Sequence, residues 1–401
     1  MFVELHIIQN FPPSNLNRDD IGQPKDCDLG GFRRARISSQ CQKRAIRWNP
    51  EFVKATKVPL GSRTKLIVQE LTRRLTAREI PEEQAQQAAI LFAEEYSGKM
   101  DQKRKEQTAV LLYLSESEFE WVASKLQENW KAISKLLAAP KPKSDENDKS
   151  SKGKKGRAEK ADTAVITDLI NELIKQTKER TSAPDIALFG RMLADRPETN
   201  IDAACQVAHA ISTHAIGKME LDYYTAMDDL QAKEKTGASF LDVAYFTSAC
   251  FYRYARLDWE QLKKNLQDDG LAVKTVEGFL RAAEAAIPSG KKNSFAQQCR
   301  PSFMLVVLRE KDSAGWSLVN AFERPVNAKS EGDLVEASVK RLDAQLGHLC
   351  SFYGDDSIKA MAVALPDGLV TPDQLGERLR ESVKNMQDWI EAICEPLRQG
   401  G

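Results

Sequence analysis

The sequence contains few of the residues that build metal sites or disulfide frameworks. Its 401 residues include four histidines and seven cysteines, and no two cysteines form a CxxC pair. The wide, odd-numbered cysteine set argues against a zinc site and against a disulfide framework. His209 and His214 are five residues apart, which is wrong for one helix face, and no HExxH segment accompanies them. We therefore expect reduced thiols in the cytoplasm, with no metal and no cofactor.

Long apolar segments and nucleotide-binding motifs are also missing. The longest apolar run, Phe303 to Leu308, is too short to span a bilayer. The first residues lack a basic segment followed by a long apolar core, so we expect no signal peptide and no membrane partner. Ser289-Gly290-Lys291-Lys292 is not a Walker motif, because GxxxxGK[ST] is absent. These absences disfavour a cofactor-dependent metabolic enzyme.

Overall charge is balanced, with 58 basic and 58 acidic residues. A neutral chain is a poor general coat for nucleic acid, but it can carry one local basic groove. With 42% hydrophobic and 29% charged residues, the composition is that of a globular protein with room for two or three domains. Zero net charge also suits a subunit that packs against copies of itself.

One stretch departs from this balance. Between Leu29 and Arg47 the chain has six basic residues and no acidic residue. Gly30-Gly31 permits a tight turn, and the arginines that follow alternate with Ala35 and Ile37 as in an extended strand. Such a local positive field predicts an anionic partner.

A helix is predicted directly after this strand. Ser38 or Ser39 can cap it, and Ser39 with Gln42 has the spacing of a capping box. Two helix faces are predicted by the spacing. The outer face contains Gln40, Lys43, Arg44 and Arg47, and the inward face contains Cys41, Ala45 and Trp48. Arginines that lead into a helix N-terminus favour phosphate binding. The alternative is a solvated basic helix.

From about Gly61 the chain changes to a helical block. Helices are predicted over 62–79, 82–96, 115–137 and 163–178, with a strand over 108–114. Residues 141–160 contain eight basic and four acidic residues but no aromatic or branched apolar residue. Because such a segment cannot bury enough surface to order itself, we predict a disordered loop there.

The rest of the chain is predicted to alternate strands with helices. Strands are predicted at 2–9, 185–192, 244–254, 303–309, 316–321 and 358–365, and helices at 271–286, 333–350 and 373–394. This order favours an α+β fold with a split βαβ sheet and a helical insertion.

Two further groups of residues admit more than one interpretation. Apolar Tyr223, Tyr224, Met227 and Leu241 lie in a charge-rich predicted hairpin, where they could stack on bases or simply pack in a core. Four acids near the basic turn could hold a metal for a nuclease, or could orient arginines and cap turns. They are Asp19, Asp20, Asp26 and Asp28.

Short motifs between about residues 15 and 325 occur together in one order. They read LNRDD at 16–20, KD at 25–26, GGFRRARISSQ at 30–40, KRA at 43–45, ALFGRM at 187–192, QVAHA at 206–210, YTAMDD at 224–229, FYRYA at 251–255, PSGK at 288–291 and NAFE at 320–323. With these motifs the chain resembles CasC, the backbone subunit of the type I-E CRISPR Cascade surveillance complex.

The resemblance implies an α+β fold shaped like a right hand. An RRM-like (ferredoxin-like) palm would carry a helical fingers insertion and a β-hairpin thumb. The implied palm segments are 1–59, 182–212 and 247–401, with fingers at 60–181 and the thumb at 213–246.

It also implies a non-catalytic function. Copies would form a helical filament along the crRNA and hold the guide's phosphates. Each thumb would wedge the guide:target duplex at regular intervals so that complementary DNA is recognised in antiviral defence. The implied partners are crRNA, the target DNA strand, copies of the chain, other Cascade subunits and a separate helicase-nuclease. The alternative is a metal-dependent RNA-cleaving backbone subunit, as in type III effector complexes.

Residue roles follow from the same resemblance. The residues that it implies hold RNA are Arg18, Lys25, Arg34, Arg36, Ser38, Gln40, Lys43, Arg44 and Arg47. Lys291 joins them as a candidate RNA contact because it lies in a predicted flexible basic loop. The thumb wedge would be Tyr223, Tyr224, Met227 and Leu241, and the contact at the base kink would be Leu188 and Met192.

Overall fold

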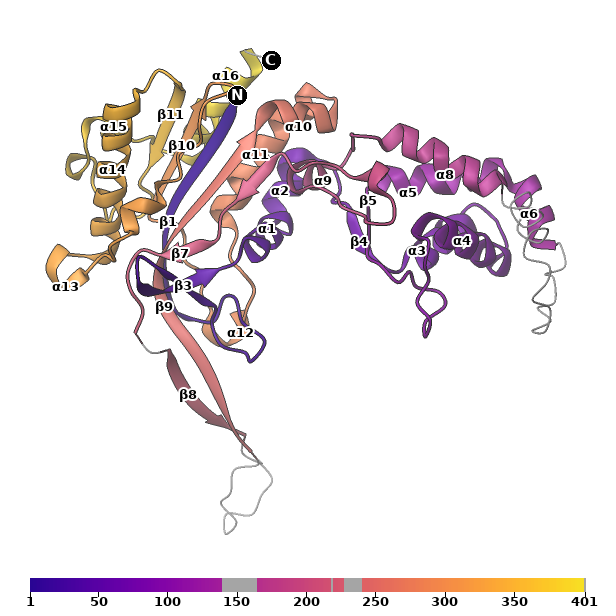
Figure 1. The fold of residues 1–401 in the computed structure, drawn as a ribbon, viewed down its shortest axis with the longest axis horizontal. Coiled ribbons are helices and arrows are strands. Elements are labelled where there is room, and N and C mark those ends of the chain that lie inside the picture. Colours follow the sequence, from indigo (N-terminus) through magenta and orange to yellow (C-terminus); the bar gives the residue numbers. More distant parts are fainter. Residues whose placement is uncertain (139–163, 218, 227–239, 400–401) are drawn as a thin grey trace, which may run out of the picture. The chain divides into compact units, whose positions relative to one another are not determined.

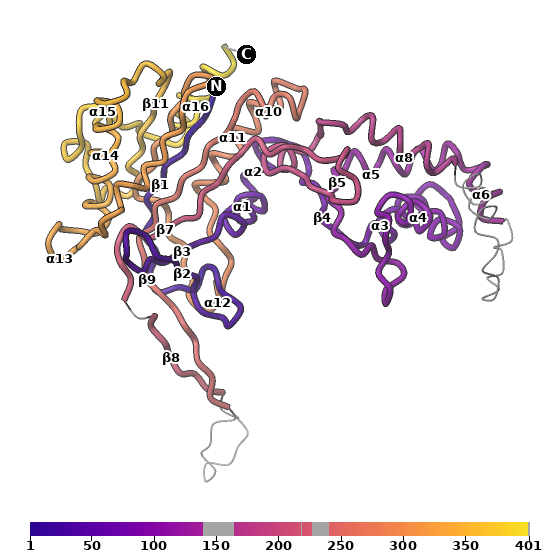
Figure 2. The backbone as a smooth tube through the Cα atoms, viewed as in Figure 1, coloured from indigo at the N-terminus to yellow at the C-terminus, as the bar shows by residue number. Residues whose placement is uncertain are grey.

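The fold comes from a computed structural model that describes residues 1–138, 164–217, 219–226 and 240–399 (Figure 1 and Figure 2). It contains two compact units. The first, here called the sheet unit, comprises 1–57, 205–260 and 269–401, and the second, the helical unit, comprises 58–204 and 261–268. The predicted loop at 141–160 and Met227 lie outside the described residues.

The sheet unit holds most of the strands. Its strands are β1 (Phe2–Ser14), β2 (Asp26–Leu29), β3 (Phe32–Ile37), β6 (Cys205–Val207), β7 (Ala210–Ser212), β8 (Glu220–Thr225), β9 (Leu241–Asp258), β10 (Phe303–Arg309) and β11 (Ile358–Ala364). Its helices are α1 (Ser39–Arg47), α2 (Pro50–Thr56), α11 (Asp269–Ala285), α12 (Lys292–Phe295), η2 (Leu318–Phe322), α13 (Ala328–Glu331), α14 (Leu334–Tyr353), η3 (Pro372–Gln374), α15 (Glu377–Arg380) and α16 (Met386–Gln399).

The strands form one large antiparallel sheet in the order β11-β10-β1-β9-β7-β3-β2, and β6 and β8 also pair with β9. At its centre Leu5 of β1 lies between Val306 of β10 and Ala255 of β9. Because β1 has neighbours on both edges and helices on both faces, every residue from Val3 to Gln9 is buried. The prediction of a mixed α and β fold is confirmed.

Helices cover the two faces of the central strands (Figure 1). On one face Ile8 and Leu305 belong to the same apolar cluster as Val339 and Leu342 of α14. On the other face Leu5 and Ile7 line a small cavity with Ile46 of α1 and with Phe279 and Ala283 of α11. Alternate residues of one strand therefore supply two separate cores.

The helical unit has its own apolar core. Its elements are β4 (Ser62–Thr64), α3 (Ile67–Thr76), α4 (Glu82–Ser97), β5 (Leu112–Leu114), α5 (Glu116–Glu128), α6 (Trp130–Ala138), α8 (Ala164–Thr177), α9 (Pro184–Phe189) and η1 (Pro197–Thr199), and α10 (Trp259–Leu266) enters it from the sheet unit. The core gathers side chains from α3, α4, α5 and α8, including Leu71, Phe92, Phe119 and Leu169.

Several predicted elements differ from the structure. The predicted strand at 185–192 is wrong, because Pro184 opens the short helix α9 and Gly190, with a positive φ, ends it. The predicted strand at 316–321 is wrong too. Leu318 and Phe322 are buried while Asn320 between them is exposed, whereas a strand would place all three on one face, so the pattern fits the helical turn η2.

Two predicted helices are interrupted. The one predicted over 115–137 divides at Asn129 into α5 and α6. The one predicted over 373–394 divides into η3, α15 and α16, and the polar segment 381–385 separates the last two. The helical unit also extends to Ala204, so residues 182–204, which the resemblance assigns to a palm, pack with the helices.

Among the described residues, no helix combines the length and the apolar character that crossing a bilayer would require.

A buried histidine lies in the sheet between two tyrosines. The Nδ1 atom of His6 is 2.8 Å from the hydroxyl of Tyr252, which accepts a hydrogen bond from the amide of Leu318 at 2.9 Å. The hydroxyl proton is therefore free to point to His6, whose Nδ1 accepts it only when the ring is neutral. Burial lowers the pKa of His6 to about 4, and the charge of Arg309 adds to the effect while Glu4 opposes it.

This geometry predicts acid sensitivity. In the unfolded chain His6 takes up its proton near its ordinary pKa of about 6.5, whereas in the fold it resists protonation down to about 4. Its contribution to stability is therefore complete above that ordinary pKa and is lost as the pH falls. We expect about 2 kcal/mol of stability to be lost between pH 8 and pH 5 through His6 alone. Denaturant unfolding at both pH values measures it.

The matched variant is His6→Asn, which keeps a hydrogen-bonding group but cannot titrate. Its stability should fall by about 2 kcal/mol less over the same pH interval. Identical pH profiles for the two proteins would show that His6 is not the sensor.

Candidate nucleic-acid interface

The basic stretch begins in a β-hairpin made by β2 and β3. Its register pairs Asp26 with Ala35 and Leu29 with Phe32, so the turn consists of Gly30 and Gly31 alone. Both glycines have positive φ, at +59° and +79°, as a two-residue hairpin turn requires. Gly30 is also fixed by contact, because a Cβ there would lie 2.1 Å from the carbonyl oxygen of Glu323.

The three arginines of β3 have three different environments. Arg33 is exposed and pairs with Asp26 at 2.8 Å and, more distantly, with Asp28. Arg36 is half-buried, and its guanidinium donates to the carbonyl of Asp26 and lies 3.1 Å from Nδ1 of His209. Arg34 is fully buried. Alternation places Arg34 and Arg36 on the same face of the strand, and other segments cover Arg34 there while Arg36 stays half-buried.

Arg34 requires a correction of its predicted role. Its guanidinium donates to the carbonyls of Ser212, Thr213 and Phe322 at 3.1, 3.0 and 2.7 Å. With its side chain enclosed and used in this way, Arg34 supports the hairpin and is not available to a guide phosphate.

Helix α1 follows as predicted, and Ser38 is its N-cap. The Ser38 hydroxyl accepts a hydrogen bond from the amide of Cys41 at 3.3 Å, and the Ser38 amide donates to Asn17 at 2.8 Å. Ser38 therefore orients the helix, with little of its own surface exposed. Gln42 does not form the predicted capping box with Ser39, because it is buried and donates to the carbonyl of Ala208 at 2.7 Å.

Cations from separate segments gather around α1. The backbone amide of Arg36 donates to the carbonyl of Lys25, which places these two residues side by side. Burial lowers the pKa of His209, and the charges of Arg36 and Lys25 lower it further. Burial raises the pKa of the Cys41 thiol, and Lys25 and Arg44 partly offset that rise. The same few residues therefore share one positive field.

We call Lys25, Arg36, Lys43, Arg44 and Arg47 the basic surface. Lys43, Arg44 and Arg47 share one face of α1, and Gln40 precedes them on that face and is exposed. A helix N-terminus together with these cations can hold several phosphates without reading bases.

The inward face of α1 differs from the prediction. Gln42 and Ile46 are its buried residues, whereas Trp48, predicted to pack inward, is 58% exposed. The helix ends at Arg47, and Asn49 and Pro50 begin the next helix, so the periodicity no longer applies at Trp48. The Asn-Pro pair was the sequence signal that could have revealed this break.

Two loops adjoin the hairpin and its helix. Gly290 packs against the backbone of Asn15 and Leu16, where a Cβ would come within 2.5 Å of both carbonyl oxygens.

Arg18 follows in a turn closed by the Arg18–Pro24 bridge and is exposed. Hydrogen bonds from Tyr224 and Val243 lower the pKa of Asp242, and the charge of Lys291 lowers it further. Lys291 therefore lies near the long strand β9. The predicted RNA contacts Arg18 and Lys291 thus belong to the sheet unit, as does the basic surface.

Three of the four acids beside the turn have structural contacts. Asp26 and Asp28 pair with Arg33, and Asp19 accepts from the amides of Ile21 and Gln23. Within the described ranges, no group of three or more His, Cys, Asp or Glu side chains is arranged to hold a metal ion.

The predicted thumb begins as a two-stranded ribbon of β8 and β9. Tyr223 lies opposite Val243, and Tyr224 opposite Asp242, whose carboxylate accepts from the Tyr224 hydroxyl at 2.8 Å. Tyr223 and Leu241 are 62% and 69% exposed. Because opposed residues point to the same side, Tyr223 and Leu241 share one face of the ribbon and Tyr224 lies on the other.

The two candidates for the base kink belong to the helical unit and differ sharply. Met192 is 83% exposed, but Leu188 is fully buried in α9. Leu188 therefore serves the core of its unit and has no surface for a base, which corrects that assignment.

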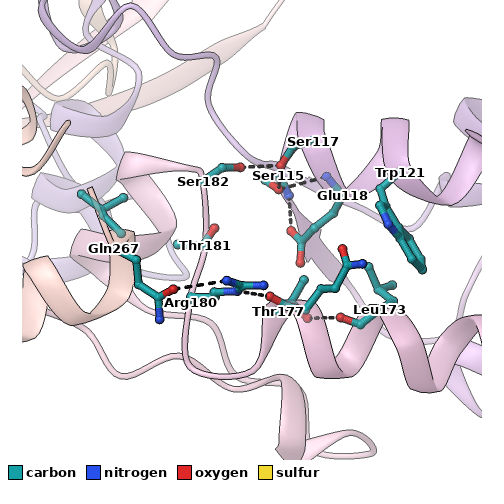
Figure 3. Close-up of a pocket in the computed structure, with 12 residues that line it drawn as sticks. Ser115, Ser117, Glu118, Trp121, Leu173, Thr177, Arg180, Thr181, Ser182 and Gln267 are labelled. Atoms are coloured by element: carbon teal, nitrogen blue, oxygen red, sulfur yellow. Dashed lines mark hydrogen bonds between the residues drawn. The ribbon is translucent and has the colours of Figure 1, made fainter. Parts of the chain in front are cut away.

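A hollow in the helical unit contains none of the predicted site residues (Figure 3). Its polar groups bond to one another: Arg180 donates to Gln267 at 3.2 Å, and the hydroxyls of Ser117 and Ser182 are hydrogen-bonded (Figure 3). Glu118, at its edge, pairs with Arg191 at 2.7 Å. Because the hydrogen-bonding capacity of these groups is used within the unit, we interpret the hollow as a structural contact between loops and helices.

Comparisons with known proteins give one consistent result. A family model described as CT1975-like protein matches residues 3–392. A chain of a structure described as "CRISPR RNA-guided surveillance complex, pre-nicking" is 28% identical, with a TM-score of 0.80 over 99% of this chain and 100% of that one. A second, from a "CRISPR RNA-guided surveillance complex", is 25% identical, with a TM-score of 0.70 over the same shares. No curated protein matches the sequence.

The hairpin turn offers a matched pair of substitutions. Gly30→Ala must accept both a positive φ and a collision with the carbonyl of Glu323, whereas Gly31→Ala faces open space at a positive φ. We expect Gly31→Ala to destabilise the protein by about 1 kcal/mol, and Gly30→Ala by about 2 kcal/mol more. Denaturant unfolding measures both. Equal losses would show that the contact with Glu323 does not constrain the turn.

Proposed function

The chain belongs to the CT1975-like family, and this family is of the CasC type that the sequence motifs resemble. We propose that the chain is a non-catalytic backbone subunit of a type I-E Cascade complex. The observation that carries this proposal is the family match over almost the whole chain. Similarity over full length to chains of RNA-guided surveillance complexes supports it. We place its action in the cytoplasm, in antiviral defence.

In this proposal the basic surface holds the crRNA. Lys25 and Arg36, beside the start of α1, and the cations of its outer face contact successive phosphates, together with Arg18 and Lys291. Such contacts supply affinity without sequence preference, which a subunit that must accept any guide needs. Sequence is read by pairing between the guide and the target DNA strand, while protein holds the backbone.

The ribbon of β8 and β9 would act as the thumb. Tyr223, Tyr224 and Leu241 present exposed apolar surface on a projecting element, as a wedge in the guide:target duplex requires. Copies of the chain would follow one another along the crRNA, and each ribbon would reach the guide held by its neighbour. Other Cascade subunits and a separate helicase-nuclease complete the proposed set of partners.

An RRM-like palm is part of the same proposal. The strand order β10-β1-β9, followed by β6 and β7 beside β9, supports it. Helices α1 and α2 follow β1, and α11 follows β9, which gives the β-α-β-β-α-β order of ferredoxin-like sheets.

Charge reversal on α1 tests the proposal. In Lys43→Glu/Arg47→Glu two phosphate contacts become repulsive, so RNA affinity should fall about 100-fold, at roughly 1.5 kcal/mol for each lost contact. The slope of log affinity against log salt should fall by about 1.4, since single strands give about 0.7 for each phosphate. Co-expression with the partner subunits and a CRISPR array, followed by measurement of particle mass and RNA content, provides the readout in the complex.

The matched control is Lys329→Glu/Lys384→Glu, which makes the same change of net charge at exposed positions of the sheet unit outside the basic surface. It should retain a large particle with a discrete guide RNA. Loss of RNA in both double variants would point to net charge rather than to this surface. A wild-type chain free of nucleic acid would refute the proposal.

The alternative function is metal-dependent cleavage of RNA by Asp19, Asp20, Asp26 or Asp28. The contacts of Asp26 and Asp28 with Arg33 favour an orienting role for these two acids. We expect complementary RNA to remain intact when it is incubated with the assembled complex and magnesium. Regularly spaced products that vanish in Asp26→Asn would establish the alternative.

A further inference from the structure

One tryptophan lies on the surface beside the cations of α1. All six tryptophans are described by the structure, and Trp48 alone is exposed, whereas Trp259 and Trp389 are buried and the other three are partly covered. Trp48 is the C-cap of α1, and its backbone amide donates to the carbonyl of Arg44. It is therefore held at a fixed place on the basic surface while most of its indole remains in water.

Two guanidinium groups lie close to this ring. The Cζ atoms of Arg47 and Arg44 are 5.3 and 5.9 Å from the ring centroid of Trp48. Attraction between each cation and the π-system orients both arginines beside the indole. A phosphate bound by either arginine would lie next to an exposed aromatic surface.

Core packing does not explain the position of this side chain. The buried residues of α1 are Gln42 and Ile46, and the turn into α2 is closed by the Asn49 side chain, which accepts from the amide of Glu51. The helix and the turn therefore have their own supports. An exposed indole beside two arginines matches the chemistry of a nucleotide in a single strand, which offers an anion and a stacking face together.

We propose that Trp48 stacks on a base of the bound guide RNA, at the nucleotide whose phosphate Arg44 or Arg47 contacts. This inference rests on the proposed function, and it adds a contact to the base at a surface otherwise suited to the backbone. Stacking tolerates every base, so the contact is compatible with guides of any sequence.

The test compares two RNAs and three proteins. One oligonucleotide is an ordinary single strand, and the other has the same backbone with abasic nucleotides. Binding of each to the full-length chain is followed by fluorescence anisotropy for wild type, Trp48→Ala and Trp48→Phe. We expect Trp48→Ala to bind the ordinary RNA about 10-fold more weakly, and the abasic RNA with nearly unchanged affinity. Trp48→Phe should keep most of the wild-type affinity, because it keeps an aromatic ring.

Two results would overturn the inference while the proposed function stands. Equal weakening toward both RNAs in Trp48→Ala would mean that the ring only positions the arginines. Unchanged binding of both RNAs, alongside a loss in Lys43→Glu/Arg47→Glu, would mean that Trp48 touches no nucleotide. If the wild-type chain binds neither RNA, the proposed function itself fails, and the stacking contact falls with it.

Intrinsic fluorescence gives an independent readout. Because Trp48 is the exposed tryptophan, RNA should quench the emission of the wild-type chain, and Trp48→Phe should remove most of that quenching. Quenching of equal size in Trp48→Phe would contradict a stacked base at this position. Circular dichroism of the variants verifies that the fold is retained.

Discussion

The basic surface depends on the hydrogen bonds of one buried group, the guanidinium of Arg34. It donates to carbonyls in two segments far away in the sequence, at Ser212 and Thr213 and at Phe322. Burial lowers the pKa of Arg34, and the nearby charge of Glu323 partly offsets this effect. The charge-assisted hydrogen bonds to these carbonyls support the buried cation. The hairpin of β2 and β3 is thereby attached along its middle, while Gly30 attaches its tip. Because α1 follows this hairpin directly, the position of its cations is fixed as well.

Contacts with other segments then give three neighbouring arginines different environments. Arg33, Arg34 and Arg36 are close neighbours in the sequence, yet one is paired with acids, one is buried and one faces His209. A local excess of positive charge therefore locates a candidate surface but is a poor guide to the environment of each cation. Which arginine faces outward depends on the partners that the sheet brings to the other side.

This division explains what could be predicted from the sequence. The turn at Gly30-Gly31, helix α1 and its outer face follow from local rules of spacing and capping. The burial of Arg34 and of Leu188 depends on segments far away in the chain, which periodicity does not contain. The prediction that Trp48 packs inward was wrong for a local reason, because the helix ends one residue before it. The prediction of a strand over 185–192 was wrong because a short run of apolar residues does not distinguish a short helix from a strand.

The ribbon of β8 and β9 gives a physical reason to regard the chain as part of an assembly. Register places Leu221, Tyr223 and Leu241 on one face and acids such as Asp222 and Asp242 on the other, and the whole of β8 is exposed. Two strands alone bury too little surface to be stable in water. An apolar face on such a ribbon is stabilised only when another surface covers it, whether a duplex or a neighbouring copy. In the proposed function a duplex or a neighbouring copy supplies that cover, and the phosphates of the crRNA neutralise the cations of the basic surface.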